Sequence, residues 1–437
     1  MSSLTATVVI QASNIVSGIF LARYLQPDGR GELAAVMLWP TVIAAIGIFG
    51  LHEAIAYHAA RRLHGGRAIL RGGLLIGGLL SLALMPIGAV VVSLVFPEHE
   101  ADEVRHAAYL YLLFIPLTFF GQFLVALFQG SLRFGAWNFL RTSVHIFTLA
   151  LIFIAHYADE GGVLGFAAAS LIANALMIVV ACVLYARADW HLSAPDVKRR
   201  PWRDLTSYGA SVHLGAAVSI IADRLDQMII SLFLPAADLG LFVIALTLSR
   251  LPLVLASTLS TVAFPKIASM SEHGDRIDVF GRYTRVALLT ILPSALGLAA
   301  LTPWLLPFFF GEAFAAATPL AWLLIVAAVP LSLKTMLSAG FKACDRGWIV
   351  SQAEIATLVL SAGALALLVP AFGLFGAAAA SVVAQGGALV FMALRARKTL
   401  GISPADLFVP RRSDIDVILQ TVDELRQAAT RRLRPAK

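Results

Sequence analysis

Two acidic residues and an arginine lie close together inside one strongly apolar stretch of the sequence. Residues 221–227 place Asp223 and Asp226 on one helical face, three positions apart, with Arg224 about 100° around the helix. Charges within the hydrocarbon region cost several kcal/mol and usually face a partner or a hydrated cavity. The cluster therefore predicts a polar cavity in which Arg224 meets an anion, or in which the two aspartates bind a proton or a sodium ion.

Further buried charges are expected in three later apolar stretches. Arg250 reaches nearly the depth of Arg224, because the chain reverses between them, so the two arginines can share one cavity. Lys334 and Glu354 each lie about six residues, roughly 9 Å, from the cytoplasmic ends of adjacent helices. This spacing allows a direct ion pair, with either a structural role or a role in binding a substrate or an ion.

The amino-terminal half holds milder polar residues inside its apolar stretches. Asn14, Gln122 and Gln129 are of the types that usually form hydrogen bonds between helices, and they are secondary candidates for a substrate cavity. Glu53 is a lone carboxylate near the inner end of a stretch, where it can stay protonated or carry a proton. The candidates for ion coupling are therefore Glu53, Asp223, Asp226 and Glu354.

Enzymatic signatures are absent from the sequence. No loop between apolar stretches is long enough to form a catalytic domain, as a membrane-bound polymerase or ligase would require. There is no phosphate-binding glycine loop, no metal-spaced set of His and Cys, and no Ser-His-Asp arrangement. We therefore predict no enzyme activity, no catalytic residue, no metal site and no cofactor, while proton or sodium coupling stays open.

The elements that position these residues are transmembrane helices. Hydrophobic residues make up 59% of the 437 residues and charged residues only 14%, against roughly 25% charged in a soluble domain. Apolar runs long enough to cross a ~30 Å hydrocarbon core recur along the chain. They predict about twelve spans, near 4–24, 33–60, 69–96, 107–130, 139–157, 163–186, 207–234, 238–265, 284–310, 316–340, 348–370 and 374–396.

Basic residues gather in one set of alternating loops. These loops include the segment at residues 187–203, while the opposite loops carry mostly Glu and Asp, with Arg23, Arg30 and Arg105 as exceptions. By the positive-inside rule both termini are cytoplasmic, and we expect a multi-pass protein of the bacterial inner membrane. The net charge of +7 follows from this arrangement and does not indicate nucleic-acid binding.

An even number of spans around a basic central loop suggests two halves related by duplication. Without gaps, residues 25–31 align with residues 234–240, and Asn14 aligns with Asp223; chance recurrence of turn residues is the alternative. We therefore expect an all-α integral membrane protein built from two six-helix bundles in a parallel pseudo-repeat. Its parts are an amino-terminal bundle at 1–190, a cytoplasmic linker at 191–206, a carboxyl-terminal bundle at 207–397 and a basic tail at 398–437.

The tail is expected to contain one further helix. After Pro410, residues 413–433 place apolar side chains on one face, and arginines gather near the end of the segment. Such an amphipathic helix is predicted to lie on the anionic inner leaflet, and docking to a partner is the alternative.

Four segments of the sequence resemble bacterial polysaccharide flippases. They are the opening at residues 14–34, the Asp-Arg-Leu-Asp-Gln-Met-Ile-Ile segment from Asp223, the Leu-Gly-Leu-Phe segment from Leu239 and the Ala-Phe-Pro-Lys segment that ends at Lys266. These flippases belong to the multidrug/oligosaccharidyl-lipid/polysaccharide exporter superfamily. The likeness covers the whole chain in topology and these segments in motif.

The resemblance implies a flippase that moves an undecaprenyl-pyrophosphate-linked oligosaccharide from the inner to the outer leaflet by alternating access. Its product would serve a surface lipopolysaccharide or exopolysaccharide. The implied ligands are the lipid-linked oligosaccharide and membrane lipids, and the implied protein partners are a polysaccharide polymerase and glycosyltransferases. Nucleic acid is not among them.

The resemblance also implies where the cargo binds. It places Arg23, Arg224 and Arg250 in the substrate cavity, and Lys334 can add a further cation for the pyrophosphate. The aspartates on either side of Arg224 depart from a simple anion site, since they can neutralise it. A cation-coupled multidrug exporter of the same superfamily is therefore the alternative.

Overall fold

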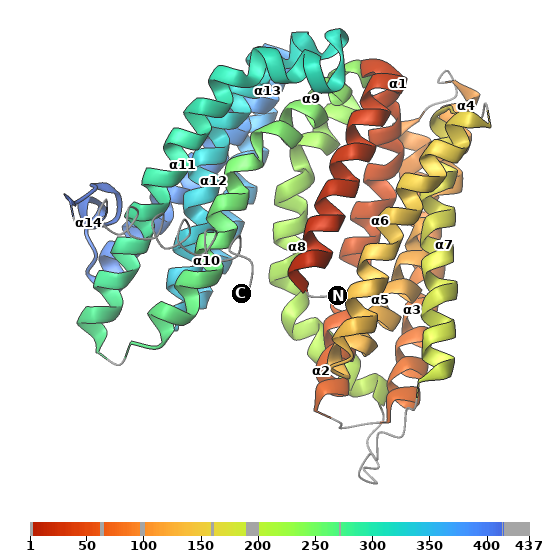
Figure 1. Cartoon of the computed structure of the whole chain (residues 1–437), viewed down its shortest axis with the longest axis horizontal. Helices are drawn as coiled ribbons and strands as arrows, with labels where there is room; N and C mark the ends of the chain where they lie inside the picture. Colours follow the sequence, from red (N-terminus) through yellow and green to blue (C-terminus); the bar gives the residue numbers. More distant parts are fainter. Residues whose placement is uncertain are drawn as a thin grey trace, which may run out of the picture. The chain divides into compact units, whose positions relative to one another are not determined.

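The computed structural model describes residues 3–61, 65–96, 101–158, 161–188, 201–270, 272–412 and Asp414. Within these ranges every regular element is a helix, which confirms the all-α prediction (Figure 1). The described chain divides into two compact units, one of residues 1–244 with 306–316 and one of the remaining residues. Apart from Asp414, the helix predicted at 413–433 lies outside the described residues.

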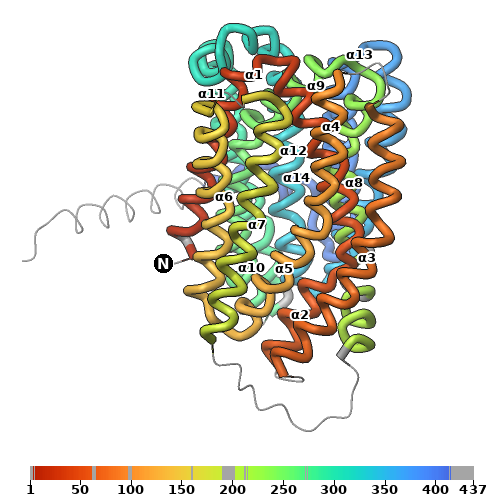
Figure 2. The backbone as a smooth tube through the Cα atoms, turned by 90° about the vertical axis from the view of Figure 1, so that its right-hand side faces the viewer, coloured from red at the N-terminus to blue at the C-terminus, as the bar shows by residue number. Residues whose placement is uncertain are grey.

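The first unit is a bundle built mainly from the amino-terminal half of the chain. Its helices α6 and α7 lie side by side (Figure 1, Figure 2), and α8 packs on α1, α2 and α3. The unit also takes in the start of α9 (Ala236–Ser249), the last turns of α11 and most of a 3-10 helix at Glu312–Ala317. Its other helices are α1 (Ser3–Gly47), α2 (Leu51–Ala60), α3 (Gly66–Val95), α4 (Asp102–Tyr111), α5 (Phe114–Gly130), α6 (Phe134–Tyr157), α7 (Val163–Arg187) and α8 (Pro201–Phe233).

The 45 residues of α1 form two helices in sequence. A straight helix of that length would reach about twice the ~30 Å thickness of a hydrocarbon core. The break falls at Gln26, whose φ of 56° is non-helical, and Pro27 then opens the second helix. Proline suits this position because the first turn of a helix does not need its N–H group. The break coincides with the loop predicted between the first two spans.

The second unit is organised around α12 (Thr318–Ala343), which packs on α10 (Leu251–Ala268) and on α13 (Gly347–Leu400). The unit also contains most of α11 (His273–Phe310) and the short α14 (Pro404–Phe408). A break at Gly373, with φ 55°, divides the 54 residues of α13.

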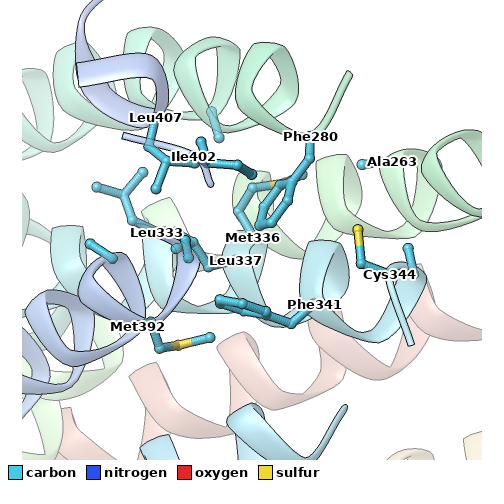
Figure 3. Close-up of a cluster of buried hydrophobic side chains, with 14 of the residues drawn as sticks. Ala263, Phe280, Leu333, Met336, Leu337, Phe341, Cys344, Met392, Ile402 and Leu407 are labelled. Carbon is cyan, nitrogen blue, oxygen red and sulfur yellow. The ribbon is translucent and has the colours of Figure 1, made fainter. Parts of the chain in front are cut away.

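A buried apolar cluster holds the helices of the second unit together (Figure 3). Phe280 and Phe341 meet edge to face with their ring centroids 5.8 Å apart. Both rings are fully buried, and close van der Waals packing of this kind drives the association of helices in a membrane, where lipid tails are as apolar as the protein interior. The cluster also includes Met336, Leu337, Met392 and Leu407.

The described helices agree with the predicted spans in position. Helical residues underlie each predicted span, with short breaks at Ile48–Gly50, at Leu112–Leu113 and at Arg250. Nine helices of the described chain are long and apolar enough to cross a membrane, or ten if the bent pair Trp202–Ala210 and Gly215–Phe233 forms one span. The exact count of twelve and the division into two six-helix bundles at residues 191–206 stay predictions.

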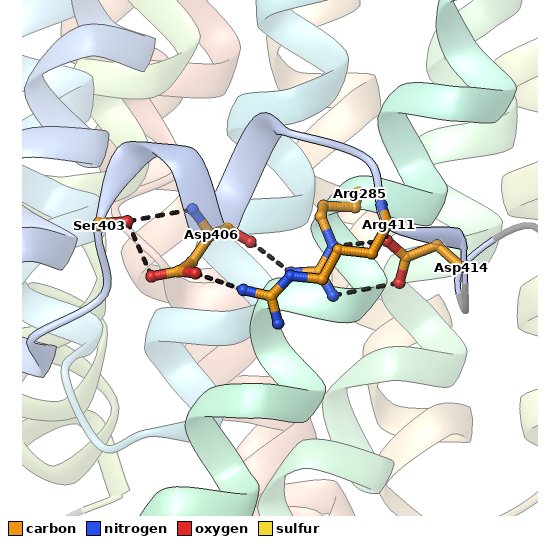
Figure 4. Close-up of polar contacts among 5 residues, drawn as sticks. All are labelled: Arg285, Ser403, Asp406, Arg411 and Asp414. Carbon is orange, nitrogen blue, oxygen red and sulfur yellow. Dashed lines mark hydrogen bonds and ion pairs between the residues drawn. The ribbon is translucent and has the colours of Figure 1, made fainter.

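A polar network fixes the segment that follows α13 onto α11 (Figure 4). Arg285 donates from Nε and Nη2 to the Asp414 carboxylate at 2.6 and 3.1 Å, and it also donates to the backbone carbonyl of Asp406. The side chains of Arg285 and Asp414 are only 5% and 0% exposed. Ser403 caps α14 by accepting from the Asp406 N–H, and Arg411 pairs with the Asp406 carboxylate. We call the segment 401–414 the C-terminal strap.

The buried pair predicts a large stability effect at the strap. Asp414→Ala leaves Arg285 buried without its partner, so we expect a loss of about 3–5 kcal/mol, measured as a lower unfolding temperature in detergent. The matched control is Asp102→Ala, which removes a more exposed pair with Arg105 and should cost about 0–1 kcal/mol. Equal effects of the two substitutions would contradict this account of the strap.

The strap also predicts a pH dependence. Burial raises the pKa of the Asp414 carboxyl, but hydrogen bonds from Arg285 and from the Arg411 N–H outweigh it, so the pKa lies below its usual range. The stabilisation is therefore fully present above the ordinary value of about 4 and is lost as pH falls through the lowered one. As the pH is lowered, the unfolding temperature of the wild type should fall until it equals that of Asp414→Asn. A difference that persists at the lowest pH would contradict this.

Candidate functional site

Two arginines line one small cavity of the first unit. The cavity has a volume of about 190 Å³ and lies between α1, α8 and α9. Arg30 comes from the second helix of α1, and Arg224 comes from α8 with Gln227 one turn later. We call this the arginine cavity, and its lining consists of Arg30, Ala34, Met37, Leu38, Thr41, Arg224, Gln227 and Val243.

Arg30 is held in an unfavourable setting. Its Nε is buried and has no hydrogen-bond partner among the described residues. A buried charged group without a partner costs free energy, and an anion bound beside it would remove that cost. The arginine cavity thus has the charge and the unsatisfied donor of an anion site.

Arg224 shows how the predicted charge cluster is arranged on α8. It donates from Nη1 to Oε1 of Gln227 at 3.3 Å, and both side chains line the arginine cavity. The Asp226 carboxylate accepts a hydrogen bond from the backbone N–H of Gln227 at 2.7 Å. Asp223 is exposed. Neither aspartate lines the arginine cavity.

A close backbone contact places α1 against α9 and so shapes the arginine cavity. A Cβ on Gly31 would lie 1.7 Å from the carbonyl oxygen of Ala236, and a Cβ on Gly240 would lie 2.0 Å from the carbonyl oxygen of Pro27. Only glycine allows such an approach. The gapless alignment of 25–31 with 234–240 pairs Gly31 with Gly240 and Pro27 with Ala236, so the two contacts are reciprocal. We call this contact the glycine crossing.

A larger cavity, lined by both apolar and polar side chains, adjoins the arginine cavity within the same unit. Its volume is about 560 Å³, within the range of roughly 300–1,000 Å³ for small-molecule sites. The two cavities share Met37 and Thr41 as lining residues. We call it the glycan cavity, and its polar lining residues are Thr41, Tyr111, Thr118, Gln122, Arg141, His145, Thr148, Ser170 and Asn174.

Some of the predicted site residues in the amino-terminal half line a cavity and others do not. Gln122 lines the glycan cavity. Asn14, Gln129 and Glu53 are exposed and line neither cavity. Arg23 donates from Nε to the carbonyl of Phe309 at 2.8 Å and from Nη2 to the carbonyl of Phe308, so it caps the last turn of α11. Their predicted roles in the cavity or in ion coupling stay predictions.

The predicted charges of the second unit also have defined surroundings. Lys334 Nζ donates to Glu354 Oε2 at 3.1 Å and to Thr357 Oγ1 at 3.3 Å, which confirms that the two charges pair directly. Lys334 is buried. Arg250 stands at the start of α10, and its buried Nε has no hydrogen-bond partner within the described chain. Whether either group meets a substrate or an ion stays a prediction.

Sequence reasoning missed two of the cavity arginines. The sequence marks Arg30 only as one of three exceptions to the loop asymmetry, and it does not mark Arg141 as a candidate. Both lie on helices and line the cavities. The position of Arg30 in the otherwise acidic set of loops is the sequence signal for this residue. A charged residue in such a position usually faces a partner or a hydrated cavity.

Known proteins match both the sequence and the fold. The family described as polysaccharide biosynthesis proteins matches residues 20–319. A probable low-salt glycan biosynthesis flippase of Haloferax volcanii, Agl15, is 21% identical over 83% of this chain and 75% of its own. A multidrug resistance MATE family transporter in an inward-facing conformation has TM-score 0.74 and 16% identity, covering 92% of this chain and 98% of that one. The lipid II flippase MurJ has TM-score 0.61 and 18% identity, covering 90% and 88%.

The chain shares its fold with the two solved structures named above, and the apolar helices of its described part make it a multi-pass membrane protein. The chain belongs to the family of polysaccharide biosynthesis proteins. The resemblance drawn from the sequence motifs is thereby confirmed.

The glycine crossing predicts that one methyl group added at Gly31 lowers both the stability of the protein and its transport. Gly31→Ala forces the backbones at residues 31 and 236 apart, so we expect at least the ~1–3 kcal/mol cost of overpacking, together with loss of transport. Gly18→Ala is the matched control, because a Cβ on Gly18 in the same α1 meets nothing within 4 Å. Unfolding temperature and surface polysaccharide report the two effects. A Gly31→Ala protein as stable and active as Gly18→Ala would contradict the contact.

Proposed function

We propose that the chain carries an undecaprenyl-pyrophosphate-linked oligosaccharide from the inner to the outer leaflet of the bacterial inner membrane. The observation that carries this proposal is the pairing of Arg30 and Arg224 in one small cavity. A pyrophosphate presents several anionic oxygens, and arginine binds such groups through two parallel hydrogen bonds. The isoprenoid tail stays in the lipid beside the protein.

The glycan part of the cargo needs a second, larger polar space. The glycan cavity adjoins the arginine cavity through Met37 and Thr41, so a cargo with its pyrophosphate between the arginines can extend its sugars into it. Amide and hydroxyl groups such as those of Gln122 and Asn174 are suited to sugar hydroxyls. This division into an anion part and a sugar part supports a lipid-linked glycan as cargo.

Transport is proposed to occur by alternating access between two six-helix bundles, with twelve spans and both termini in the cytoplasm. The breaks at Gln26 and Gly373 support this count, because each divides one long helix into two pieces of spanning length. The reciprocal contact at the glycine crossing supports a duplicated architecture. Arg23, Arg250 and Lys334 remain proposed cavity residues, and Glu53, Asp223, Asp226 and Glu354 remain proposed coupling residues.

Membership of the family supports a proposal for the product and the functional partners. A polysaccharide biosynthesis protein that moves a lipid-linked glycan would act between the glycosyltransferases that build it inside and the polymerase that uses it outside. We propose these as functional partners for a surface lipopolysaccharide or exopolysaccharide. The relative from Haloferax volcanii supports a role in glycan biosynthesis.

Export of cationic drugs is the second candidate, because a MATE family transporter shares the fold. A cationic cargo needs carboxylates in its cavity. Among the described residues that line the arginine and glycan cavities there are three arginines and no Asp or Glu. The charge of these two cavities therefore favours an anionic cargo, and a drug-resistance assay of expressing cells separates the candidates.

The proposal predicts that Arg224→Ala and Arg30→Ala each abolish surface polysaccharide while protein levels stay normal. Each removes charged hydrogen bonds worth about tenfold to a hundredfold in affinity. Arg224→Lys keeps the positive charge but cannot donate two parallel hydrogen bonds, so it should give an intermediate amount of surface polysaccharide. Polymer on the cell surface is measured by immunoblot against a deletion strain.

The matched control is Arg105→Ala, which changes an arginine on α4 that pairs with Asp102 and lines neither cavity. Normal polymer in this variant shows that loss of an arginine is not harmful in itself. Normal polymer in Arg224→Ala would remove Arg224 from the mechanism, and normal polymer in both cavity variants would refute the pyrophosphate site.

A further inference from the structure

Arg141 lines the glycan cavity and forms no ion pair with any residue that the structure describes. It lies on α6, where its guanidinium stacks over the ring of Trp137 at 4.4 Å from the centroid. The ion pairs of the described chain involve other basic residues, and none joins Arg141 to a carboxylate. The Trp137 ring fixes the guanidinium without neutralising it, because a cation over an aromatic face keeps its charge and its donors. The Arg141 guanidinium is therefore positioned to bind an anion.

The surroundings of Arg141 add donors but no negative charge. His145 follows one helical turn later on the same face of α6, and both line the cavity. Among the described lining residues none is acidic. A site with one guanidinium, one imidazole and no carboxylate matches a ligand that carries a single anionic group.

Other lining residues of the cavity provide groups for a neutral polar ring. Asn174 donates through Nδ2 to the carbonyl of Ser170 at 2.9 Å, which leaves its Oδ1 to accept from a ligand. The Phe114 ring lines the cavity and stacks on the buried ring of Tyr111, with the two centroids 5.2 Å apart. The Tyr111 hydroxyl is within 3.2 Å of the Ser170 hydroxyl. Hydrogen-bonding groups beside an aromatic surface suit a sugar ring.

We infer that the glycan cavity is a subsite for an acidic sugar of the transported glycan, with Arg141 and His145 binding the sugar carboxylate. The inference rests on the proposed function, since the sugar is delivered by the lipid whose pyrophosphate occupies the arginine cavity. A carboxylate accepts two parallel hydrogen bonds from one guanidinium, and His145 supplies a third donor. Gln122 and Asn174 bind hydroxyls of the same ring.

The same cations suit a second source of negative charge, the pyrophosphate itself. A carboxylate and a phosphate are both oxyanions, but only the sugar carboxylate can be removed from the cargo while the pyrophosphate stays. Two synthetic lipids therefore distinguish the sources. Both are prenyl-pyrophosphate disaccharides, one ending in glucuronic acid and the other in glucose, so that they differ by a carboxylate in place of a CH₂OH group.

The experiment measures binding of the two lipids to the full chain in nanodiscs. The wild type should bind the glucuronyl lipid about tenfold to a hundredfold more tightly than the glucosyl lipid. Arg141→Gln should remove this preference while binding of the glucosyl lipid stays, which also shows that the variant is folded. Arg141→Lys should keep part of the preference, and Arg133→Gln, which changes the arginine before α6 outside both cavities, should keep all of it.

The other outcomes overturn the inference in distinguishable ways. Equal binding of both lipids by the wild type refutes the acidic-sugar subsite and leaves the proposed function standing. An equal loss for both lipids in Arg141→Gln assigns Arg141 to the pyrophosphate instead. Binding of neither lipid by the wild type refutes the proposed function together with the subsite.

Discussion

The glycine crossing is the constraint on which the cavities of the first unit depend. The backbones at residues 31 and 236, and at 240 and 27, approach so closely that a Cβ at either glycine would overlap a carbonyl oxygen. This contact fixes the second helix of α1 against α9 at the point where Arg30 enters the arginine cavity. About two and three turns further along α1, Met37 and Thr41 form the wall shared with the glycan cavity. The close backbone contact thus positions the arginine cavity and the wall that it shares with the glycan cavity.

The cavities beside the glycine crossing are lined by arginines. Arginines inside an apolar bundle lose hydration, and Arg30 keeps a buried donor without a partner among the described residues. A cavity lined by arginines, with no Asp or Glu among its described lining residues, is stabilised by an anionic ligand and disfavours a cationic one. Proteins of one fold can therefore differ in cargo through the charge of their cavities.

Features governed by local periodicity were predictable from the sequence. The fixed rise of 1.5 Å per residue placed Lys334 and Glu354 at matching depths, and the structure pairs them at 3.1 Å. The helical stretches and the break near Gln26 followed from apolar runs and turn residues. The alignment of residues 25–31 with 234–240 identified two segments that turn out to contact one another, although the alignment alone could not reveal this contact.

Features governed by long-range packing were not predictable. Arg285 and Asp414 are 129 residues apart, and nothing in either local segment indicates their pairing. Arg30 and Arg141 looked like boundary charges, because the depth of a residue near a helix end depends on how far that helix extends. The prediction that Arg224 and Arg250 share a cavity joins residues of two different compact units and stays a prediction.

Direct flipping in proteoliposomes tests the central claim, that paired arginines recognise the pyrophosphate of a lipid-linked glycan. Two fluorescent prenyl glycans are offered from one leaflet, one joined through pyrophosphate and one through a plain ether, and their arrival in the opposite leaflet is followed by quenching. The account predicts protein-dependent flipping of the pyrophosphate lipid and background rates for the ether lipid. Equal flipping of both lipids would contradict it.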